Sequence, residues 1–437
     1  MADFARSDSS AVQAQLDRLA LLSPGGDRLG LDRITRLLDR LGRPQDRLPP
    51  VFHVAGTNGK GSACAFLRAV LEAAGLKVHV FTSPHLVLFN ERIRLGGRLI
   101  SDPLLAELLS EVLDSSEGIE PSFFEVTTAA AFLAFAREPA DACIVEVGLG
   151  GRLDATNVIE RPLVCGIAGL GLDHKQWLGR TLAKIAAEKA GIAKSGVPLV
   201  TQRYPPQAAR QVLEVADKAG AAWIGRGAAW QSRIIRDSIY YRDRHGALKL
   251  PLPRLPGRHQ ADNAALAVAM LRHQALFDIP ESAMAKGIRS VKWPARLQRL
   301  GTGPLTKRLP EGSEMWIDGG HNGAAARLIA DHVKHAFAND RLPLAILFAC
   351  LSSKDPRAML QPFAGLATDV HTLPIQNHEH RSPEELAALA SGLGFSATAN
   401  DSLKEALERV AQPSRVLLFG SLYLAGEALK ANGQPPD

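Results

Sequence analysis

One segment constrains the fold of this chain more than any other, because it joins a short apolar strand to a glycine-rich turn, a lysine and a helix. It spans residues 51–62 and reads Val-Phe-His-Val-Ala-Gly-Thr-Asn-Gly-Lys-Gly-Ser. Successive backbone N–H groups in such a loop converge on phosphate oxygens, and the positive end of the following helix points the same way. The loop is not a strict Walker motif, because two residues instead of four separate Gly56 from Gly59 and a glycine follows Lys60. We expect a phosphate cradle with Lys60 as its mobile cation, in preference to a glycine-rich turn that binds nothing.

Short apolar runs rich in β-branched residues recur through the first half of the chain, and helical patterns separate them. Strands that alternate with helices predict a mainly parallel sheet that helices cover on both faces. In such a sheet, ligand loops lie at the carboxyl ends of the strands. The expected fold class is therefore α/β, with strands at 51–54, 78–81, 142–147, 163–167 and 198–201.

A second, smaller α/β domain is expected beyond an interruption at residues 291–295, which read Val-Lys-Trp-Pro-Ala. Pro294 holds its predecessor in extended geometry, so this stretch is suited to a linker. Alternating segments between Trp230 and Pro253 predict a hairpin excursion before it. The expected division is a first domain at 1–290, the linker at 291–295 and a second domain at 296–437. Strands of the second domain are expected at 315–317, 344–348, 370–374 and 416–419.

Composition favours a compact protein without secretory or membrane segments. The 437 residues are 46% hydrophobic, which is enough for the cores of two or three domains. Residues 1–10 lack the apolar run of a signal peptide, and the longest apolar segments are too short to span a bilayer. Cys64, Cys143, Cys165 and Cys350 lie far apart without metal-ligand spacing, which favours reduced core thiols. We expect a cytoplasmic protein.

The net charge of +6 is spread over the sequence, with acidic and basic residues interleaved. A basic excess can mark nucleic-acid binding, but neither a dense block of lysine and arginine nor a basic stretch with interleaved aromatic residues is present in the sequence. Small anionic substrates account for the excess equally well. We expect small-molecule ligands, no nucleic acid, no membrane and a monomer.

Polar residues lie at the ends of several expected strands. Ser83 follows the second strand, Glu146 closes the third, and His174 lies beyond the fourth. A buried carboxylate without a partner is costly, so a cation at Glu146 is favoured, with a plain salt bridge as the alternative. Ser83 before Pro84 is by itself more typical of a turn, and a lone histidine is usually a solvated loop residue. The place of His174 after a strand end favours a ligand role.

The motifs together resemble the folylpolyglutamate synthase and dihydrofolate synthase family, within the Mur ligase superfamily, from about Leu29 to Ser421. They are Gly-Thr-Asn-Gly-Lys-Gly-Ser at 56–62, Thr-Ser-Pro-His-Leu at 82–86, Glu-Val-Gly-Leu-Gly-Gly-Arg-Leu-Asp-Ala-Thr-Asn at 146–157, Leu-Asp-His at 172–174, Glu-Lys-Ala-Gly at 188–191, Pro-Gly-Arg-His-Gln at 256–260 and Asp-Gly-Gly-His-Asn at 318–322. Such a series is highly specific. The resemblance implies a P-loop, Mur-ligase-like central domain and a Rossmann-like C-terminal domain.

The family implies an ATP-dependent amide ligase that couples dihydropteroate, or a folate, to the amine of L-glutamate. A carboxylate is a poor electrophile, so ATP first phosphorylates it and the amine then displaces phosphate from the acyl phosphate. The neighbouring anions need bridging cations, for which Mg²⁺ is suited. The resemblance implies one ion at Ser62 and Glu146 and a second at Ser83, Glu146 and His174. The imidazole ligand makes Mn²⁺ an alternative.

The resemblance also assigns roles to single residues. Lys189 matches a lysine that the family carries as a carbamate, although by composition alone it reads as a solvated helix residue. Lys60, Lys189 and His321 are the expected catalytic residues, His321 being a candidate for the glutamate or γ-phosphate region. ATP contacts map onto Gly56, Thr57, Asn58, Gly59, Lys60, Gly61, Ser62, Asn263, Arg296 and Asp318. Substrate contacts map onto Phe124, Glu125, Leu153, Asp154 and Ala155.

Some features leave alternatives open. Phe124 fits a helix core equally well, and Arg296 fits a linker cation. Because Asn263 precedes the linker and Arg296 follows it, we expect ATP to join the two domains. Another Mur-type ligase and a non-ligating nucleotide-binding regulatory protein are the alternative functions. The chain departs from the family pattern at Leu88, Lys175 and Gly323, which bears on substrate loops and not on the ATP site. The sequence leaves open whether one or both glutamylation activities are present, how long the polyglutamate becomes and which folate is preferred.

Overall fold

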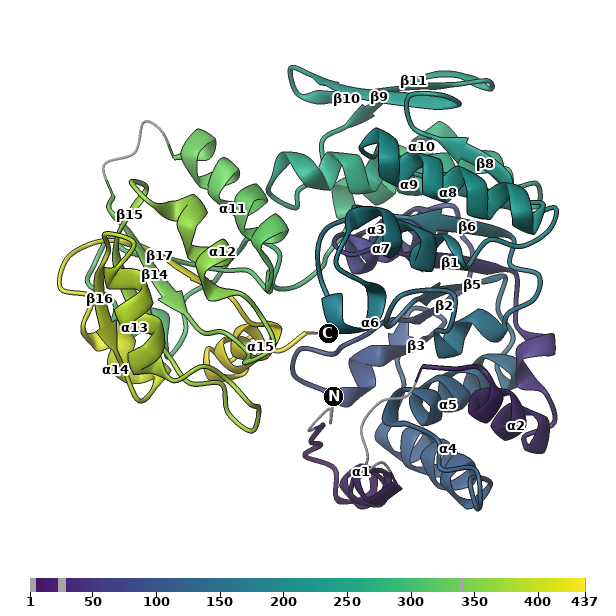
Figure 1. Ribbon diagram of the computed structural model, residues 1–437, viewed down its shortest axis with the longest axis horizontal. Helices are drawn as coiled ribbons and strands as arrows, with labels where there is room; N and C mark the ends of the chain where they lie inside the picture. The colour runs from purple at the N-terminus through teal and green to yellow at the C-terminus, as the bar shows by residue number, and fades with distance from the viewer. Residues whose placement is uncertain (1–4, 23–28, 338–341, 437) are drawn as a thin grey trace. The chain divides into compact units, whose positions relative to one another are not determined.

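The computed structural model describes residues 5–22, 29–337 and 342–436. Residues 1–4, which belong to the segment 1–10 without the apolar run of a signal peptide, lie outside the described residues. The chain divides into two compact units, each with its own sheet (Figure 1). Unit 1 comprises Met1–Arg254 and Gln260–Lys292, and unit 2 comprises Leu255–His259 and Trp293–Asp437. Both units mix helices with mainly parallel strands, which confirms the expected α/β class.

Unit 1 is built on an eight-stranded sheet with the order β4-β3-β2-β5-β1-β6-β7-β8. The strands are β1 (Val51–Ala55), β2 (Val78–Phe81), β3 (Ile93–Leu95), β4 (Arg98–Leu99), β5 (Ala142–Glu146), β6 (Val164–Ile167), β7 (Pro198–Thr201) and β8 (Ala222–Gly225). All pairings are parallel except those of β3 with β2 and with β4. The five strands expected from the sequence are confirmed within one residue at each end. The edge strands β4 and β8, and β3 beside β4, were not expected, because short, partly exposed runs carry little apolar signal.

Helices follow most of these strands and bury them on both faces. Every residue of β1, β2, β5 and β6 is buried, as a doubly covered parallel sheet requires. The helices of unit 1 are α1 (Ser10–Leu22), α2 (Asp32–Arg40), α3 (Lys60–Ala73), α4 (Asp102–Asp114), α5 (Phe123–Arg137), α6 (Lys175–Leu178), α7 (Leu182–Ala190), α8 (Pro206–Ala219), α9 (Arg258–His273, from Gln260 on) and α10 (Glu281–Ser290), with 3-10 turns η1 (Pro44–Arg47), η2 (Phe89–Arg92) and η3 (Ala155–Val158).

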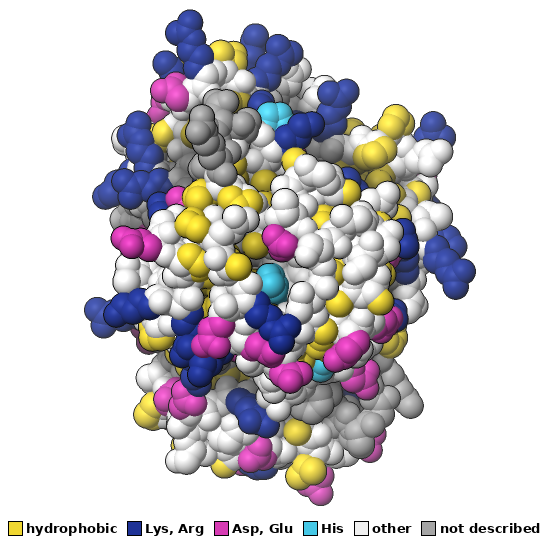
Figure 2. All heavy atoms as spheres, turned by 90° about the vertical axis from the view of Figure 1, so that its left-hand side faces the viewer, with side chains coloured by type: hydrophobic (Ala, Val, Ile, Leu, Met, Phe, Trp, Pro, Cys, Tyr) yellow, Lys and Arg dark blue, Asp and Glu magenta, His cyan; other side chains and the backbone are white. Residues whose placement is uncertain are grey.

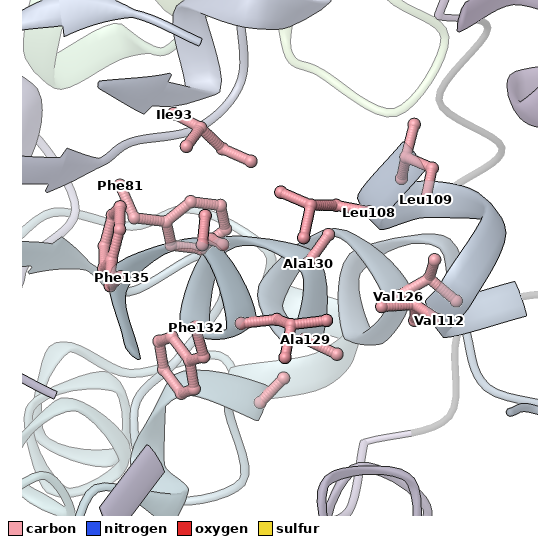
Figure 3. Packing of buried hydrophobic residues seen from close by; sticks show 14 of the residues in the cluster. Phe81, Ile93, Leu108, Leu109, Val112, Val126, Ala129, Ala130, Phe132 and Phe135 are labelled. Atoms are coloured by element: carbon pink, nitrogen blue, oxygen red, sulfur yellow. The ribbon is translucent and has the colours of Figure 1, made fainter. Parts of the chain in front are cut away.

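A large apolar cluster of unit 1 lies between the sheet and helices α4 and α5. Phe132 and Phe135 of α5 are fully buried with Phe81 of β2, and the small Ala130 of α5 lies beside Leu108 of α4 (Figure 3). Burial of each such phenylalanine contributes about 1.5–3 kcal/mol. This cluster fixes α5, and therefore Phe124 and Glu125 in its first turn, against the sheet.

Helix α10 packs closely on α3, the helix that follows the phosphate loop. A Cβ atom added to Gly287 would lie 2.6 Å from the Cα and N atoms of Val70. Alanine in place of a helical glycine normally stabilises by about 1 kcal/mol. Here we expect Gly287→Ala to lower the free energy of unfolding by about 1–3 kcal/mol, because backbone cannot move aside like a flexible side chain.

Urea unfolding midpoints measure this effect. The matched control is Gly30→Ala, because a Cβ atom there meets nothing within 4 Å. Its unfolding midpoint should stay close to that of the wild type. A Gly287→Ala protein as stable as the Gly30→Ala protein would contradict the close packing of α10 on α3.

The expected hairpin is present and has a third strand. Strands β9 (Trp230–Ile235), β10 (Ser238–Asp243) and β11 (Gly246–Pro251) form a separate antiparallel sheet in the order β11-β10-β9. Arg272 of α9 fastens this sheet, since its Nε and Nη2 atoms each donate to the Asp243 carboxylate at 2.7 Å. Buried Tyr241 adds a hydrogen bond to the same carboxylate at 2.9 Å.

Unit 2 contains a six-stranded sheet in the order β12-β13-β17-β14-β15-β16, in which only β12 runs antiparallel to its neighbour. The strands are β12 (Gln298–Arg299), β13 (Glu314–Ile317), β14 (Leu344–Phe348), β15 (Ala367–Thr372), β16 (Ser396–Ala399) and β17 (Arg415–Phe419). The helical elements are α11 (Gly323–Ala336), α12 (Pro356–Leu360), α13 (Pro383–Ser391), α14 (Leu403–Glu408), α15 (Leu422–Ala431), η4 (Thr306–Arg308) and η5 (Gln361–Phe363). Its core includes the tilted rings of Phe348, Phe363 and Phe419.

Three expectations from composition concern the interior and the surface. Cys64, Cys143, Cys165 and Cys350 are buried free thiols, as expected. Within the described ranges, no helix has both the length and the apolar character needed to cross a membrane. Figure 2 shows one face of the molecule, on which the coloured lysine and arginine side chains are interspersed with acidic ones and do not merge into one continuous basic patch.

Candidate functional site

The register of the parallel strands places several loops of unit 1 side by side. Phe81 pairs with Val145, Val54 pairs with Glu146, and Ala55 pairs with Ile167. The carboxyl ends of β2, β5, β1 and β6 therefore lie at one edge of the sheet, in that order. The loops that begin at Thr82, Val147, Gly56 and Ala168 all start at this edge, where open α/β sheets bind ligands.

The phosphate loop is tied to the loop after β6. Thr57 N donates to Gly169 O at 2.8 Å, and Thr57 Oγ1 donates to Gly171 O at 3.1 Å. Gly59 has φ +86° directly before α3, and an added Cβ atom would collide with Oδ1 of Asn263. Glycine is required there both by the backbone conformation and by this contact. Asn263 of α9, an expected ATP contact, therefore lies against the loop.

Lys60 and Glu146 face each other across the gap between α3 and β5. Lys60 Nζ lies 3.9 Å from Glu146 Oε1, and Ser83 N donates to Glu146 Oε2 at 3.2 Å. Ser62 is buried, and its Oγ atom has no hydrogen-bond partner among the residues that the structure describes. An orphaned hydroxyl in the same helical turn as Lys60, together with the buried carboxylate that Lys60 faces, fits a hard cation, which binds oxygen ligands.

His174 directly precedes the short helix α6, in the loop after β6. It adopts the left-handed conformation, with φ 48° and ψ 40°, and its N–H donates to Asp173 Oδ1 at 2.8 Å. Its Nε2 atom lies 4.0 Å from the same carboxylate oxygen. In the described part of the chain, no three His, Cys, Asp or Glu side chains group as a metal site. The expected ligand set accordingly consists of one carboxylate, one imidazole and the hydroxyls of Ser62 and Ser83.

Lys189 is not a solvated helix residue, because its side chain is buried at the end of α7. Burial, followed by the positive charge of Lys60, lowers the pKa of Lys189 to about 7, although Asp173 and Asp154 oppose the shift. A large share of the amine is therefore neutral at neutral pH. The ammonium of Lys60 and the amine of Lys189 thus belong to one electrostatic cluster with these two carboxylates.

The loop after β5 packs against the end of α7. Arg152 N donates to Glu188 O at 2.8 Å, and the Arg152 guanidinium lies 2.9 Å from the Glu188 carboxylate. A Cβ atom on Gly151 would lie 2.7 Å from Glu188 O and 2.8 Å from Lys189 O. This close approach holds the loop that carries Leu153 and Asp154 beside Lys189.

The buried Asp154 carboxylate organises its own loop. Oδ2 accepts from Leu149 N at 2.8 Å, and Oδ1 accepts from Thr156 N at 3.0 Å and from Thr156 Oγ1 at 2.5 Å. Burial raises the pKa of Asp154, while these donors act against the rise. Half-buried Leu153 and buried Ala155 flank it, and Ala155 starts η3. The backbone of Gly148 adds a further hydrogen bond to this carboxylate.

Phe124 and Glu125 lie in the first turn of α5. The ring of Phe124 lies over Gly148, where an added Cβ atom would be 2.5 Å from Cζ, and it is half-buried. Glu125 closes a capping box with Ser122, and its Oε2 atom lies 3.0 Å from Nε of Arg33. Phe124 thus borders the loop that carries Asp154, whereas Glu125 is engaged by the chain itself.

Sequence reasoning missed the residues that organise the loop after β2. Glu91 accepts the backbone N–H groups of Leu86, Val87 and Leu88 at 2.7–2.9 Å. Buried Arg92 donates to His85 Nδ1 at 2.9 Å. The consecutive Glu-Arg pair after an apolar stretch was the available signal. These contacts shape the loop that begins with Ser83 beside Glu146.

Unit 2 brings three predicted residues together at the end of β13. Asp318 Oδ1 accepts from Gly320 N at 2.7 Å and Oδ2 from Leu297 N at 2.9 Å. Burial raises the pKa of Asp318, and the nearby Arg296 acts against the rise. Half-buried His321 follows, with Nδ1 3.2 Å from Gly319 O. The strand order also places the loops after β17 and β14 at this edge, and these carry Ser421 and Lys354, which the sequence did not single out.

The three departures from the family pattern lie at defined places. The N–H of Leu88 belongs to the Glu91 contacts, and Lys175 is the first residue of α6. Gly323 is the first residue of α11, and a Cβ atom there would lie 3.0 Å from Cβ and O of Ala358. A larger residue at this position would therefore crowd Ala358 of α12.

No family model matches the sequence. Among curated proteins, the chain is 33% identical over 422 residues to a dihydrofolate synthase/folylpolyglutamate synthase from Bacillus subtilis, covering 93% of this chain and 95% of that protein. Among solved structures, it is similar to E. coli FolC in complex with DHPP and ADP, with a TM-score of 0.87, 30% identity and 98% of each chain covered. A bifunctional folylpolyglutamate synthase/dihydrofolate synthase with Mn, AMPPNP and L-glutamate bound has a TM-score of 0.84 and 29% identity, covering 98% of this chain and 99% of that one.

Proposed function

The chain belongs to the dihydrofolate synthase/folylpolyglutamate synthase family, and from this we propose that it is an ATP-dependent ligase that joins L-glutamate to dihydropteroate and to folylglutamates. The observation that carries the proposal is the meeting of the phosphate loop with Glu146 at the carboxyl edge of the unit 1 sheet. Loops at that edge supply the cation, the carboxylate and the backbone donors that phosphoryl transfer to a carboxylate needs.

Residues of unit 1 are proposed to hold the phosphates and the metal ions. The backbone of residues 56–62 and the Lys60 ammonium neutralise phosphate oxygens and keep the transferred group in line. Ser62, Ser83, Glu146 and His174 would hold the two ions. Mg²⁺, or Mn²⁺, would supply charge neutralisation between the phosphates and the substrate carboxylate. The orphaned hydroxyl of Ser62 supports this assignment.

Lys189 is proposed to act as a carbamate, formed when its neutral amine attacks CO₂ and loses a proton. The new C–N bond converts a buried cation into an anion, which suits a place beside Lys60 and near a metal ion. The burial of Lys189 and its pKa of about 7 support the proposal, because only the free amine reacts.

Residues of unit 2 are proposed to bind the nucleoside of ATP and the incoming amino acid. Arg296 and Asp318 lie together and are suited to base contacts, as Asn263 of unit 1 is. His321 is proposed to contact the glutamate or the γ-phosphate region. Ser421 and Lys354, which follow the neighbouring strands, are added as candidates for the glutamate carboxylates because they share this edge.

The pterin is proposed to lie between Phe124 and the loop of Asp154. The half-buried ring of Phe124 can stack on the flat pterin, and a carboxylate oxygen of Asp154 can accept a hydrogen bond from a pterin N–H. Leu153 and Ala155 would line the same pocket. Glu125 stays assigned to the substrate site, but its contacts with Ser122 and Arg33 support a role in positioning the first turn of α5.

Asp154→Ala is expected to raise KM for dihydropteroate by about 10–100-fold, because the pterin donor is left unpaired in a buried site. The Kd of ATP should change by less than about threefold, which is below about 0.7 kcal/mol. Steady-state kinetics and ATP titration measure the two effects. An equal loss of ATP affinity would remove Asp154 from the pterin site.

A phosphate-release assay with ATP, L-glutamate and a pterin acceptor tests the function. Dihydropteroate and tetrahydrofolate should each stimulate release, and mass spectrometry should show one or more added glutamates. Release with an amino-sugar nucleotide acceptor in place of the pterin would favour another Mur-type ligase. Slow ATP hydrolysis that no acceptor stimulates would favour a nucleotide-binding regulatory protein.

The location and the oligomeric state complete the proposal. We place the enzyme in the cytoplasm, in keeping with its four free thiols, and propose that it is a monomer. Light scattering should give a mass close to 46.9 kDa, and a mass of twice that value would contradict the monomer.

A further inference from the structure

A buried histidine on the central strand is connected to the proposed pterin-binding carboxylate. His53 Nε2 of β1 lies 2.8 Å from Thr156 Oγ1, and Thr156 Oγ1 donates to Asp154 Oδ1 at 2.5 Å. His53 and Thr156 are fully buried, and Asp154 is 2% exposed. The three side chains form one continuous hydrogen-bonded chain inside unit 1.

The hydrogen bonds of this chain run in one direction. The Thr156 hydroxyl carries a single proton, which it gives to Asp154, so His53 must donate its Nε2–H to Thr156. The ring nitrogen Nδ1 is then unprotonated, and it is buried without a partner among the described residues. Burial also lowers the pKa of His53 to about 3, so the ring is neutral.

We propose that His53 is a positioning residue for the pterin substrate, which acts through Thr156 to keep Asp154 a hydrogen-bond acceptor. This inference rests on the proposed function, in which Asp154 receives a pterin N–H. If the Thr156 proton turned toward His53, an oxygen lone pair would face Asp154 Oδ1. The carboxyl group would then need a proton of its own to keep the contact, and it could present a donor to the pterin.

These hydrogen bonds therefore select a ligand by whether its polar edge donates or accepts hydrogen bonds. A pterin edge that offers N–H donors matches an ionised Asp154, whereas an edge that offers only acceptors is repelled. Discrimination between donor and acceptor ligands is strong in a buried site, because a polar group left unpaired there cannot form a hydrogen bond with water instead.

A purely structural role for His53 predicts a different outcome, and the chain offers a matched control. His79 of β2 is as fully buried as His53 and also makes local hydrogen bonds. Its Nε2 atom lies 2.9 Å from Glu138 O, and its Nδ1 atom accepts from Gly96 N at 3.0 Å. Neither partner belongs to the proposed pterin site, so His79 reports the cost of removing a buried histidine from this sheet.

The experiment measures dihydropteroate binding by titration calorimetry, together with KM, kcat and thermal unfolding. Thr156→Val, which has the shape of threonine but lacks the hydroxyl, should raise Kd and KM for dihydropteroate by about 10-fold or more. Its Kd for ATP should stay within about twofold of the wild-type value. Thr156→Ser, which restores the hydroxyl, should recover most of the binding.

The histidine variants test whether His53 acts through Thr156. His53→Leu should weaken dihydropteroate binding about as much as Thr156→Val does, and the double variant should be no worse than either single one. His79→Leu should lower the unfolding temperature comparably and leave dihydropteroate binding unchanged. If His53→Leu does not fold, His53→Gln keeps a donor near the position of Nε2 and should retain binding, whereas Thr156→Val still reports the hydroxyl.

The outcomes separate this inference from the proposed function. Normal binding by Thr156→Val, together with weak binding by Asp154→Ala, would overturn the inference and leave the pterin role of Asp154 intact. Normal binding by Asp154→Ala would overturn both. Equal losses in His53→Leu and His79→Leu would show a general effect of sheet destabilisation and would also overturn the inference.

Discussion

Lys60→Ala is expected to lower kcat by about 100–1,000-fold, which corresponds to about 3–4 kcal/mol of lost transition-state stabilisation. Lys60 lies in the first turn of the helix that follows the phosphate loop, and its ammonium is 3.9 Å from the Glu146 carboxylate. A cation there neutralises charge on the phosphoryl group as it is transferred. A water molecule that enters the space left in Lys60→Ala carries no positive charge and does not supply this stabilisation. Phosphate release with saturating ATP and dihydropteroate measures the effect.

Lys77→Ala is the matched control for this variant. Lys77 precedes β2 at the amino end of the strand and forms an ion pair with Glu138 at 2.6 Å, with both side chains nearly half exposed. Removal of such a surface pair should leave kcat within about twofold of the wild-type value. If Lys60→Ala also kept its turnover within about threefold, the phosphate-cradle assignment would be wrong.

Lys189→Ala is expected to lower the ligation rate by about 100-fold, or about 2.7 kcal/mol, because it removes the negative carbamate proposed beside Lys60. Acetate should restore part of the activity, since a small carboxylate can enter the space left by the side chain. Acetate should not rescue Lys60→Ala, which lacks a cation. Equal responses of the two variants to acetate would contradict the carbamate.

The pH dependence of CO₂ reactivation gives an independent test of Lys189. Its pKa of about 7 means that the neutral amine gains population as the pH rises through that value. Enzyme stripped of CO₂ at low pH should therefore recover activity faster at pH 8 than at pH 6 when both samples contain the same concentration of dissolved CO₂. Labelled CO₂ should give a carbamate signal in the wild type that Lys189→Ala lacks. A wild-type enzyme that is fully active without CO₂, and an active Lys189→Ala variant, would falsify the carbamate.

The amino-acid sequence by itself determined the features that depend on local pattern. Apolar, β-branched runs at 51–54, 78–81 and 142–147 predicted the central strands, because burial on both faces requires them to be apolar throughout. The order of strand, glycine turn, lysine and helix at residues 51–62 predicted the phosphate loop. Because parallel strands end at one edge, the sequence also predicted that Ser83 and Glu146 lie near this loop, and their hydrogen bond agrees with that.

The tertiary structure alone decided which polar groups are buried and how they are paired. Lys189 reads as a solvated helix residue, whereas in the structure it is buried and the loop at Gly151 packs onto the end of α7. The Asp154 carboxylate accepts hydrogen bonds from Leu149 and Thr156. His53 of β1, about 100 residues earlier in the sequence, completes this series of hydrogen bonds through Thr156. Periodicity reports which face of an element is apolar, whereas the partner of one buried polar atom depends on contacts between segments that are far apart in the sequence.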